Sequence, residues 1–258
     1  LKDLEKEFIT SENDFILIGE AEEKVIQIIN NFIKNLKVDN ILGLIGKNFA
    51  NSSRELISNL DNLPLADWSQ IPLKNYWKLR HSHGPLSNKK YLSILTSRGC
   101  PYPCRFCVVP ETNNRRWRFK SPEKVVDEIE YFQKKLGIDE FHFEDLNPTV
   151  NDIRTKAICK EIIKRNIKII WKIVSGTKVE SIKNIETVDL MAVSGCKYIS
   201  ISPESGSENV MKNIGKPFNL EHAYKIVKRM NEKKYFHKRV LCLVSQMKGK
   251  MILIRRKK

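Results

Sequence analysis

From residue 91 onward, strand-like apolar runs alternate with amphipathic stretches of helical spacing, and this alternation constrains the fold more than any other feature. Strands separated by helices pair in parallel through right-handed crossovers, which is the organisation of α/β domains. The predicted fold class is therefore α/β. The expected strands are residues 91–97, 138–144, 168–174, 197–202 and 238–244.

Three of the stretches between the strands begin with a side chain that can cap a helix. Ser121 is followed by proline at the first helical position, and Asn151 and Asn219 stand before similar periodic apolar patterns. Serine and asparagine at this position accept a hydrogen bond from an otherwise unpaired backbone amide. We therefore expect a helix to begin at each of these three residues.

Three cysteines follow the first expected strand at C-x3-C-x2-C spacing: Cys100, Cys104 and Cys107. Thiolates this close together suit a soft metal centre, and short runs of this kind hold iron–sulfur clusters. A 4Fe–4S cube has four irons, so three ligands leave one iron open for a cofactor or substrate. Structural zinc is the competing interpretation, but no fourth Cys or His stands nearby at the spacing of a zinc finger. The loop follows a strand, and sites in such folds lie at the carboxyl ends of strands.

With the aromatic Phe106 just before its last cysteine, the motif resembles the signature of the radical S-adenosylmethionine (radical SAM) enzymes. The resemblance implies that the three cysteines hold a 4Fe–4S cluster, whose open iron is chelated by the amine and carboxylate of S-adenosylmethionine (SAM). One electron from the cluster then cleaves the sulfonium, and the resulting 5′-deoxyadenosyl radical abstracts hydrogen from the substrate. Phe106 is implied to lie by the adenine. The implied fold is a (βα)6 barrel, which we expect to be partial because five strands can be counted.

The same resemblance assigns residues at the other strand ends to the cofactor or substrate. Glu204 and Ser205 stand in a Glu-Ser-Gly-Ser turn, where the family contacts the ribose, and a carboxylate can accept two hydrogen bonds from a diol. Glu144 or Asp145 would pair with the ammonium of SAM or with the substrate, unless they cap the next helix. Ser175 is a candidate for cofactor or substrate contact, although turn chemistry explains its position equally well.

The first part of the chain has a different pattern, and we assign residues 1–58 to a second domain. A strand ending at Gly19-Glu20, a helix and a Leu-Asp-Asn-Leu-Pro linker resemble the C-terminal remnant of the Rossmann-like cobalamin-binding domain that precedes many radical SAM domains. The cobalt-ligating Asp-x-His-x-x-Gly motif of that domain is missing, so we expect a truncated start and little or no cobalamin binding. Residues 59–90 are the predicted linker and residues 91–244 the radical SAM core.

The segment 245–258 is a basic tail that leaves the strand–helix pattern, and a shifted reading frame is our hypothesis for it. The whole chain carries a net charge of +16, but its lysines are spread along the sequence rather than clustered. Nucleic acid is therefore disfavoured as a partner. In the linker, His81 and His83 are interpreted as solvated rather than as metal ligands.

The hydropathy pattern and the positions of the cysteines indicate the cellular compartment of this chain. No apolar run reaches the roughly 18 residues that a membrane-spanning helix needs, so no transmembrane segment is expected. The cysteines outside the motif, Cys159, Cys196 and Cys242, stand singly in apolar surroundings and are expected to be buried free thiols. These features predict a reduced, cytoplasmic protein.

Together the features predict a radical SAM enzyme of the cobalamin-dependent type. We expect a methyltransferase, or a ring-forming or rearranging enzyme, that acts on a small or lipid-like substrate and receives electrons from a flavodoxin or ferredoxin. Two alternatives stay open. One is an RNA-modifying radical SAM enzyme of the methylthiotransferase kind, and the other is a fragment that binds a cluster without turnover.

Overall fold

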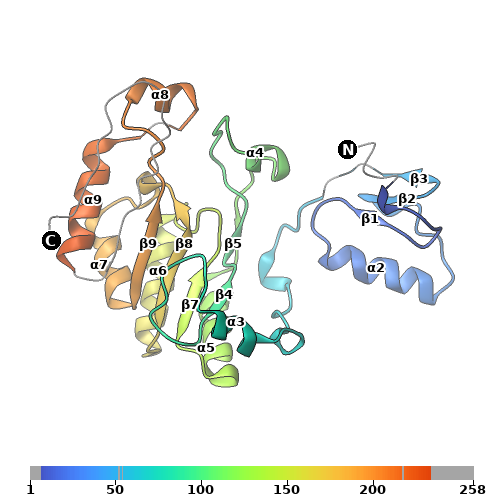
Figure 1. The fold of residues 1–258 in the computed structure, drawn as a ribbon, viewed down its shortest axis with the longest axis horizontal. Coiled ribbons are helices and arrows are strands. Elements are labelled where there is room, and N and C mark those ends of the chain that lie inside the picture. Colours follow the sequence, from blue (N-terminus) through green and yellow to red (C-terminus); the bar gives the residue numbers. More distant parts are fainter. Residues whose placement is uncertain (1–6, 52, 54, 217, 234–258) are drawn as a thin grey trace. The chain divides into compact units, whose positions relative to one another are not determined.

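Two separate units make up the chain, residues 1–63 and residues 64–258, and each is described by itself. The structure is a computed structural model, drawn as a ribbon in Figure 1. Among the residues it describes, no helix is both long and apolar enough to cross a membrane. The described residues are 7–51, 53, 55–216 and 218–233.

The first unit consists of a small antiparallel sheet and one long helix, α2 (Glu22–Ile33). The strands are β1 (Ile16–Leu17), β2 (Leu44–Gly46) and β3 (Phe49–Ala50), in that order across the sheet. The predicted strand and helix are therefore present, and β1 pairs antiparallel with β2. The assignment of this unit to a cobalamin-binding domain stays a prediction. Helix α2 exposes apolar side chains, namely Val25, Ile26, Ile29, Phe32 and Ile33.

The second unit is built on a four-stranded parallel sheet with the strand order β4–β7–β8–β9. This arrangement confirms the α/β prediction and four of the expected strands. The fifth expected strand, residues 238–244, and the basic tail lie outside the described residues. The strands of the sheet are β4 (Leu92–Ile94), β7 (Glu140–Phe143), β8 (Ile170–Thr177) and β9 (Cys196–Ile201).

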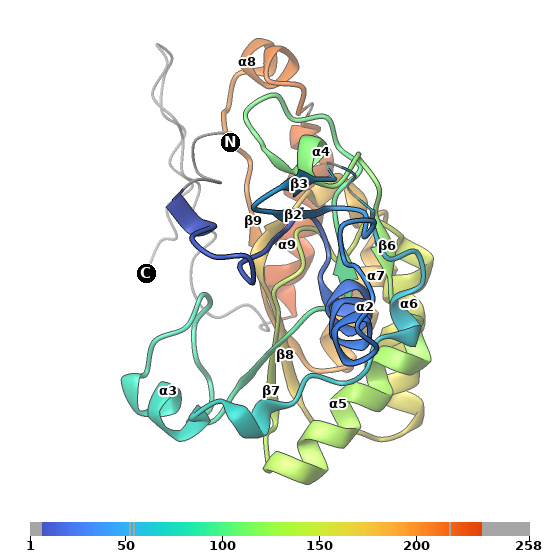
Figure 2. The ribbon, with the colours of Figure 1, turned by 90° about the vertical axis from the view of Figure 1, so that its right-hand side faces the viewer.

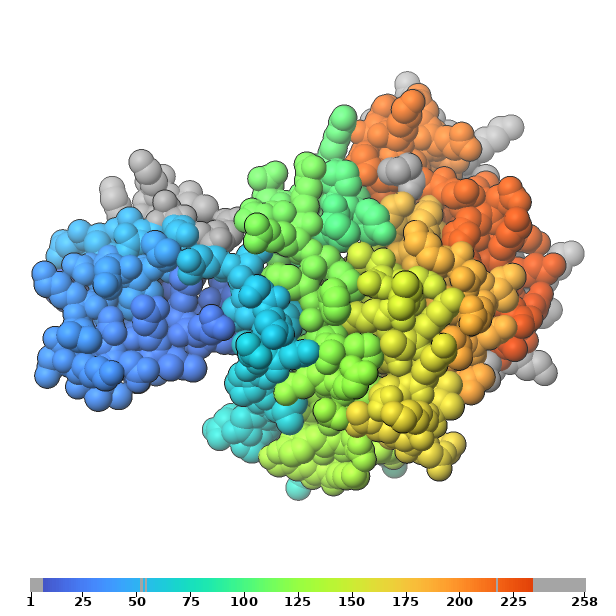
Figure 3. All heavy atoms as spheres, turned by 180° about the vertical axis from the view of Figure 1, so that it is seen from behind, coloured from blue at the N-terminus to red at the C-terminus, as the bar shows by residue number. Residues whose placement is uncertain are grey.

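Helices cover one face of this sheet, as Figures 1 and 2 show. Helix α6 packs between α5 and α7, and α9 packs on α7, which gives the continuous layer seen from behind in Figure 3. The side chains of Ser121, Asn151 and Asn219 each accept a hydrogen bond from the backbone amide three residues on, so the predicted caps are confirmed. The helices are α5 (Pro122–Leu136), α6 (Asp152–Lys164), α7 (Ile185–Val193) and α9 (Leu220–Glu232).

The apolar core lies between the sheet and these helices, because alternate residues of a strand point to opposite faces. Phe141 and Phe143 on β7 and Trp171 and Ile173 on β8 are buried in this core. The rings of Phe143 and Trp171 stack with their centroids 5.0 Å apart. Burial of one such side chain contributes about 1.5–3 kcal/mol. This layer therefore supplies the main apolar stabilisation of the sheet.

The opposite face of the sheet, called the inner face below, carries charged side chains at the intervening strand positions. Glu140 and His142 on β7 and Lys172 on β8 are buried to within 1% of complete. Lys172 Nζ lies 2.6 Å and His142 Nε2 lies 2.8 Å from the same carboxylate oxygen of Glu140. Burial acts to raise the pKa of Glu140, but hydrogen bonds from His142 and Lys172 outweigh it and lower that pKa. The cluster is therefore a buried ion pair with an attached imidazole.

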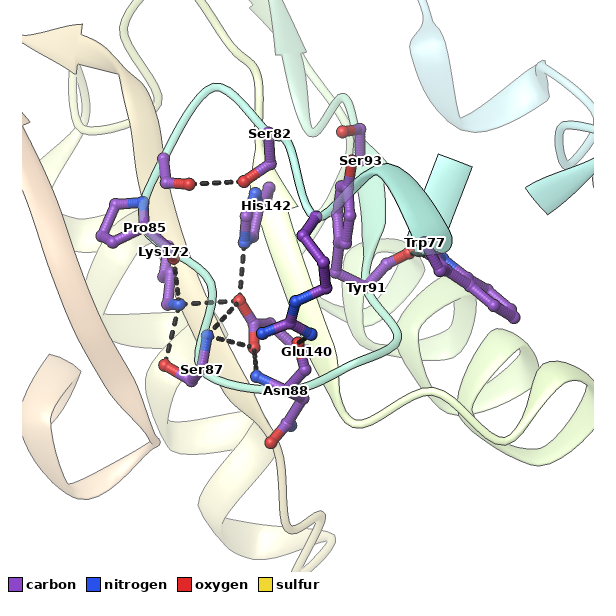
Figure 4. Close-up of polar contacts among 12 residues, drawn as sticks. Trp77, Ser82, Pro85, Ser87, Asn88, Tyr91, Ser93, Glu140, His142 and Lys172 are labelled. Atoms are coloured by element: carbon purple, nitrogen blue, oxygen red, sulfur yellow. Dashed lines mark hydrogen bonds and ion pairs between the residues drawn. The ribbon is translucent and has the colours of Figure 1, made fainter. Parts of the chain in front are cut away.

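Residues 81–91, called the strap below, cover this charged cluster (Figure 4). The Lys172 ammonium donates to the Pro85 carbonyl at 2.5 Å and to the Ser87 hydroxyl at 2.9 Å. The Glu140 carboxylate accepts two consecutive backbone amides of the strap, at 3.0 and 2.5 Å. The buried charges thus neutralise each other, and the strap adds hydrogen bonds to both of them.

Two further contacts fix the position of the strap. On α3 (Leu73–Leu79), the Trp77 indole N–H donates to the Tyr91 carbonyl at 2.8 Å. Gly84 lies so close to β8 that a Cβ there would sit 2.4 Å from Val174 Cγ1. A residue with a side chain at this position would therefore push the strap away from the sheet.

Candidate functional site

The cysteine loop, residues 99–108, begins at the carboxyl side of the first parallel strand. It leaves β5 (Ser97–Arg98), which pairs antiparallel with β6 (Arg118–Phe119), so two short paired strands flank the segment that contains the loop. Gly99 has a φ of +80°, and a Cβ there would lie 2.0 Å from the Arg116 carbonyl oxygen. Only glycine fits a turn of this conformation against a neighbouring backbone.

All three cysteines of the loop are free, partly exposed thiols. Burial raises the pKa of Cys100 and of Cys104, and the neighbouring thiols of the loop raise both further. The ammonium of Lys216 acts in the opposite direction on both. This cation does not outweigh burial, so iron, which binds the thiolate, must displace the thiol protons. The donor chemistry thus fits an iron–sulfur cluster, although no three His, Cys, Asp or Glu side chains of the described residues are already arranged to hold a metal ion.

The isolated cysteines behave differently. Cys159 and Cys196 are free and fully buried, which confirms the prediction of buried thiols, while Cys242 lies outside the described residues. Burial raises the pKa of Cys159 to about 12, and that of Cys196 well above its ordinary value. These two thiols therefore stay protonated and are poor metal ligands.

Asp145 follows β7 and supports the turn that leads into the cysteine loop. Its buried carboxylate accepts the Thr96 amide at 3.0 Å, the Thr96 hydroxyl at 2.8 Å and the Ser97 hydroxyl at 2.5 Å. Burial raises the pKa of Asp145, and these hydrogen bonds act against the rise. The Ser175 hydroxyl donates to the Asp145 carbonyl. The Asp145 carboxylate is thus enclosed by these partners, and the predicted contacts of Asp145 and Ser175 with cofactor or substrate stay predictions.

Glu144, by contrast, keeps a partly exposed carboxylate at the end of β7. One oxygen lies 2.8 Å from His83 Nδ1, and the other accepts the Ser93 hydroxyl at 3.3 Å. His83 belongs to the strap. The His83 side chain pairs with Glu144 and stays exposed, as expected for a linker histidine. The predicted contact between Glu144 and an ammonium group or substrate stays a prediction, and it suits an anchored carboxylate that faces solvent.

Glu204 follows β9 and takes a left-handed backbone conformation, with a φ of +52°. One of its carboxylate oxygens lies 2.6 Å from the Lys216 ammonium, and its side chain is 31% exposed. The neighbouring Ser205 hydroxyl accepts the Ser207 amide at 3.2 Å, just before α8 (Glu208–Asn213). The predicted ribose contact of Glu204 and Ser205 stays a prediction.

Phe106 lies near the tip of the cysteine loop, before α4 (Val109–Thr112), and 58% of its surface is exposed. The Lys216 ammonium lies 6.0 Å from the centre of the Phe106 ring. The structure therefore brings together two predicted cofactor residues, Phe106 and Glu204, through a lysine between them.

Sequence reasoning missed Lys216 and the buried cluster of Glu140, His142 and Lys172. The cluster had a signal, because Glu140, His142 and Glu144 occupy every second position of an expected strand and must share one face. No sequence signal pointed to Lys216, since its contacts depend on a turn that packs against the cysteine loop.

Comparison with known proteins decides the family. The Radical SAM superfamily matches residues 94–245, which is more than half of the chain. The chain belongs to the radical SAM superfamily. Members of this superfamily are enzymes that use a 4Fe–4S cluster and SAM, and the matched part of this radical SAM chain contains the cysteine loop, Glu144 and Glu204.

Curated relatives of this radical SAM chain include methyltransferases and cyclases. An uncharacterized methyltransferase of Pyrococcus horikoshii is 27% identical over 83% of this chain and 45% of its own length. The anaerobic magnesium-protoporphyrin IX monomethyl ester cyclase of Synechocystis is 29% identical over 79% of this chain and 40% of its own length. The chain thus spans less than half the length of these relatives.

A solved structure shows the same fold. The radical SAM methyltransferase TsrM from Kitasatospora setae, with cobalamin and a [4Fe-4S] cluster bound, has a TM-score of 0.67 and 19% identity. The match covers 85% of this chain and 45% of that chain. At this identity the likeness concerns the fold, and it supports a parallel sheet of radical SAM type.

Proposed function

We propose that this chain is the catalytic core of a radical SAM enzyme in which Cys100, Cys104 and Cys107 hold the 4Fe–4S cluster. When bound, the cluster supplies the electron that cleaves SAM reductively. Phe106 would flank the adenine, Glu204 with Ser205 the ribose, and Glu144 the ammonium group. The observation that carries this proposal is the gathering of three partly exposed thiols, Phe106 and Glu204 around one loop at the carboxyl ends of parallel strands.

We infer that the reaction is a methyl transfer, or a ring closure or rearrangement, on a small or lipid-like substrate. The names of the methyltransferase and cyclase relatives support this class. A flavodoxin or ferredoxin would supply the electron, and the free thiols suit the reducing cytoplasm. Residues 1–63 contain no histidine that could ligate cobalt, so we expect this chain to bind cobalamin weakly or not at all.

Removal of one thiol tests the assignment of the cluster ligands. After anaerobic reconstitution, we expect about four irons per chain in the wild-type protein. The Cys104→Ala variant should lose most of this iron, because it removes one of three proposed ligands. The matched control is Cys159→Ala, which removes a buried thiol and should keep the iron. An equal loss in both variants, measured by iron assay and visible absorbance, would refute the ligand assignment.

Product analysis separates an enzyme from a cluster-binding fragment. The reduced, reconstituted protein should convert SAM into methionine and 5′-deoxyadenosine, detected by chromatography and mass spectrometry. Iron uptake without these products would favour the fragment.

A further inference from the structure

We propose that Lys216 is a positioning residue that fixes Glu204 and Phe106 as one preassembled recognition site for the adenosyl half of SAM. The inference rests on the proposed function and extends it to a residue that the sequence motif does not include. Lys216 lies in the connection between α8 and α9, outside both the cysteine loop and the turn at Glu204.

The contacts of Lys216 join the two sides of the site. Its ammonium lies 2.6 Å from the Glu204 carboxylate and donates to the Ser202 carbonyl at 2.7 Å. The same ammonium stands 6.0 Å from the centre of the Phe106 ring, near the outer limit of a cation–π contact. The Lys216 side chain is only 12% exposed, so these partners replace most of its hydration.

The backbone on either side of Lys216 is also attached to the cysteine loop. The Arg105 amide donates to the Ile214 carbonyl at 2.9 Å. Gly215 has a φ of +71°, and a Cβ there would lie 2.8 Å from the Pro103 carbonyl oxygen. Because these contacts hold residues 214–215 against the cysteine loop, the Lys216 side chain reaches Glu204 from a position that is fixed relative to that loop.

This arrangement leaves the recognising groups available. A carboxylate has about four lone-pair sites, so one charge-assisted contact to Lys216 orients Glu204 and leaves its second oxygen for a diol. Phe106 remains 58% exposed, which leaves ring surface for a flat base to stack on. Lys216 thus holds Glu204 beside the Phe106 ring before a ligand arrives, which lowers the entropic cost of binding.

The test uses SAM and its two halves as probes of the full, cluster-loaded chain. Anaerobic equilibrium dialysis should show that Lys216→Met weakens binding of SAM and of 5′-deoxyadenosine by the same factor, about tenfold or more. Binding of L-methionine should not change. Lys216→Arg, which keeps the charge, should retain most of the affinity. Lys212→Met is the matched control, because Lys212 is exposed on α8, and it should bind all three probes like the wild-type protein.

A double-mutant cycle excludes a general folding defect. If Lys216 acts through Glu204, then Lys216→Met should cost much less additional 5′-deoxyadenosine affinity in a Glu204→Gln background than in the wild-type background. Equal losses for methionine and 5′-deoxyadenosine, or tighter SAM binding by Lys216→Met, would overturn the inference while leaving the proposed function standing. A cluster-loaded wild-type protein that binds no SAM would overturn both.

Discussion

On β8, the adjacent residues Lys172 and Ile173 point to opposite faces of the sheet, and their surroundings differ in kind. Ile173 packs among buried apolar side chains beneath the helices. Lys172 is equally buried, but its partners are a carboxylate, a hydroxyl and a carbonyl under the strap. The helix-covered face is stabilised by non-directional burial, whereas the inner face depends on matched charges and hydrogen bonds.

The difference teaches that the two faces tolerate change differently. An apolar layer loses stability in proportion to the atoms removed, and its neighbours can partly close the gap. A buried ion pair fails abruptly when one partner is removed, because the other charge is left without compensation. Three substitutions test this contrast. Unfolding can be followed by tryptophan fluorescence, since all four tryptophans, Trp68, Trp77, Trp117 and Trp171, lie in the second unit.

The largest effect is expected from Lys172→Ala. This change leaves the buried Glu140 carboxylate without its ammonium partner, and we expect a loss of about 3–5 kcal/mol of unfolding free energy in urea titrations. The double variant Glu140→Gln with Lys172→Met removes both charges and should recover most of the loss. A double variant as unstable as Lys172→Ala would show that the ion pair is not the source of the effect.

A smaller loss is expected on the other side of the same strand. Ile173→Val removes one methylene group from the apolar core and should cost about 0.5–1.5 kcal/mol in the same titration. A cost equal to that of Lys172→Ala would contradict the contrast between the faces.

The smallest effect is expected on the solvent side of the helices. Asp189 on α7 forms a two-pronged ion pair with Arg229 on α9, both contacts at 2.8 Å, and these hydrogen bonds lower the pKa of Asp189. Because the pair is partly exposed, Asp189→Asn should cost only about 0.2–1 kcal/mol at neutral pH. The pKa is lower in the folded state, so this contribution is present above the unfolded pKa of about 3.9 and is lost as the pH falls through the folded pKa.

Unfolding titrations of the wild-type protein and the Asp189→Asn variant at pH 7 and below pH 3 check this pH dependence. The two proteins should differ at neutral pH and converge in acid. A difference that persists in acid would mean that Asp189 contributes through packing rather than charge.

The helix-covered face was predictable from sequence because it obeys local rules. Apolar residues at strand and helix spacing identified four strands, and the caps at Ser121, Asn151 and Asn219 identified helix starts. Strand ends were less predictable, since β8 extends three residues past its expected end through a register irregularity against β9. Such irregularities depend on a neighbouring strand that lies far away in sequence.

The candidate site was predictable only in part, for the same reason. The cysteine loop and Glu204 stand in short motifs that can be recognised from residue order alone. The different surroundings of Glu144 and Asp145 could not be inferred, because the order of two adjacent acidic residues does not say which of them the fold will bury. Residues 81–90 of the strap fall in the predicted linker, and their contacts with Lys172 and Glu140 could not be predicted because they arise only after folding.

The strap also bears on the order in which the molecule assembles. Its contact from Pro85 to Lys172 spans 87 residues, and its contact from Asn88 to Glu140 spans 52 residues. Closing loops of this length carries an entropic cost that local helix contacts do not have. The strap contacts side chains of two neighbouring strands, so we expect it to dock late in folding, after β7 and β8 have paired. The strap also carries His83, so the contact between His83 and Glu144 is expected to form in the same late step.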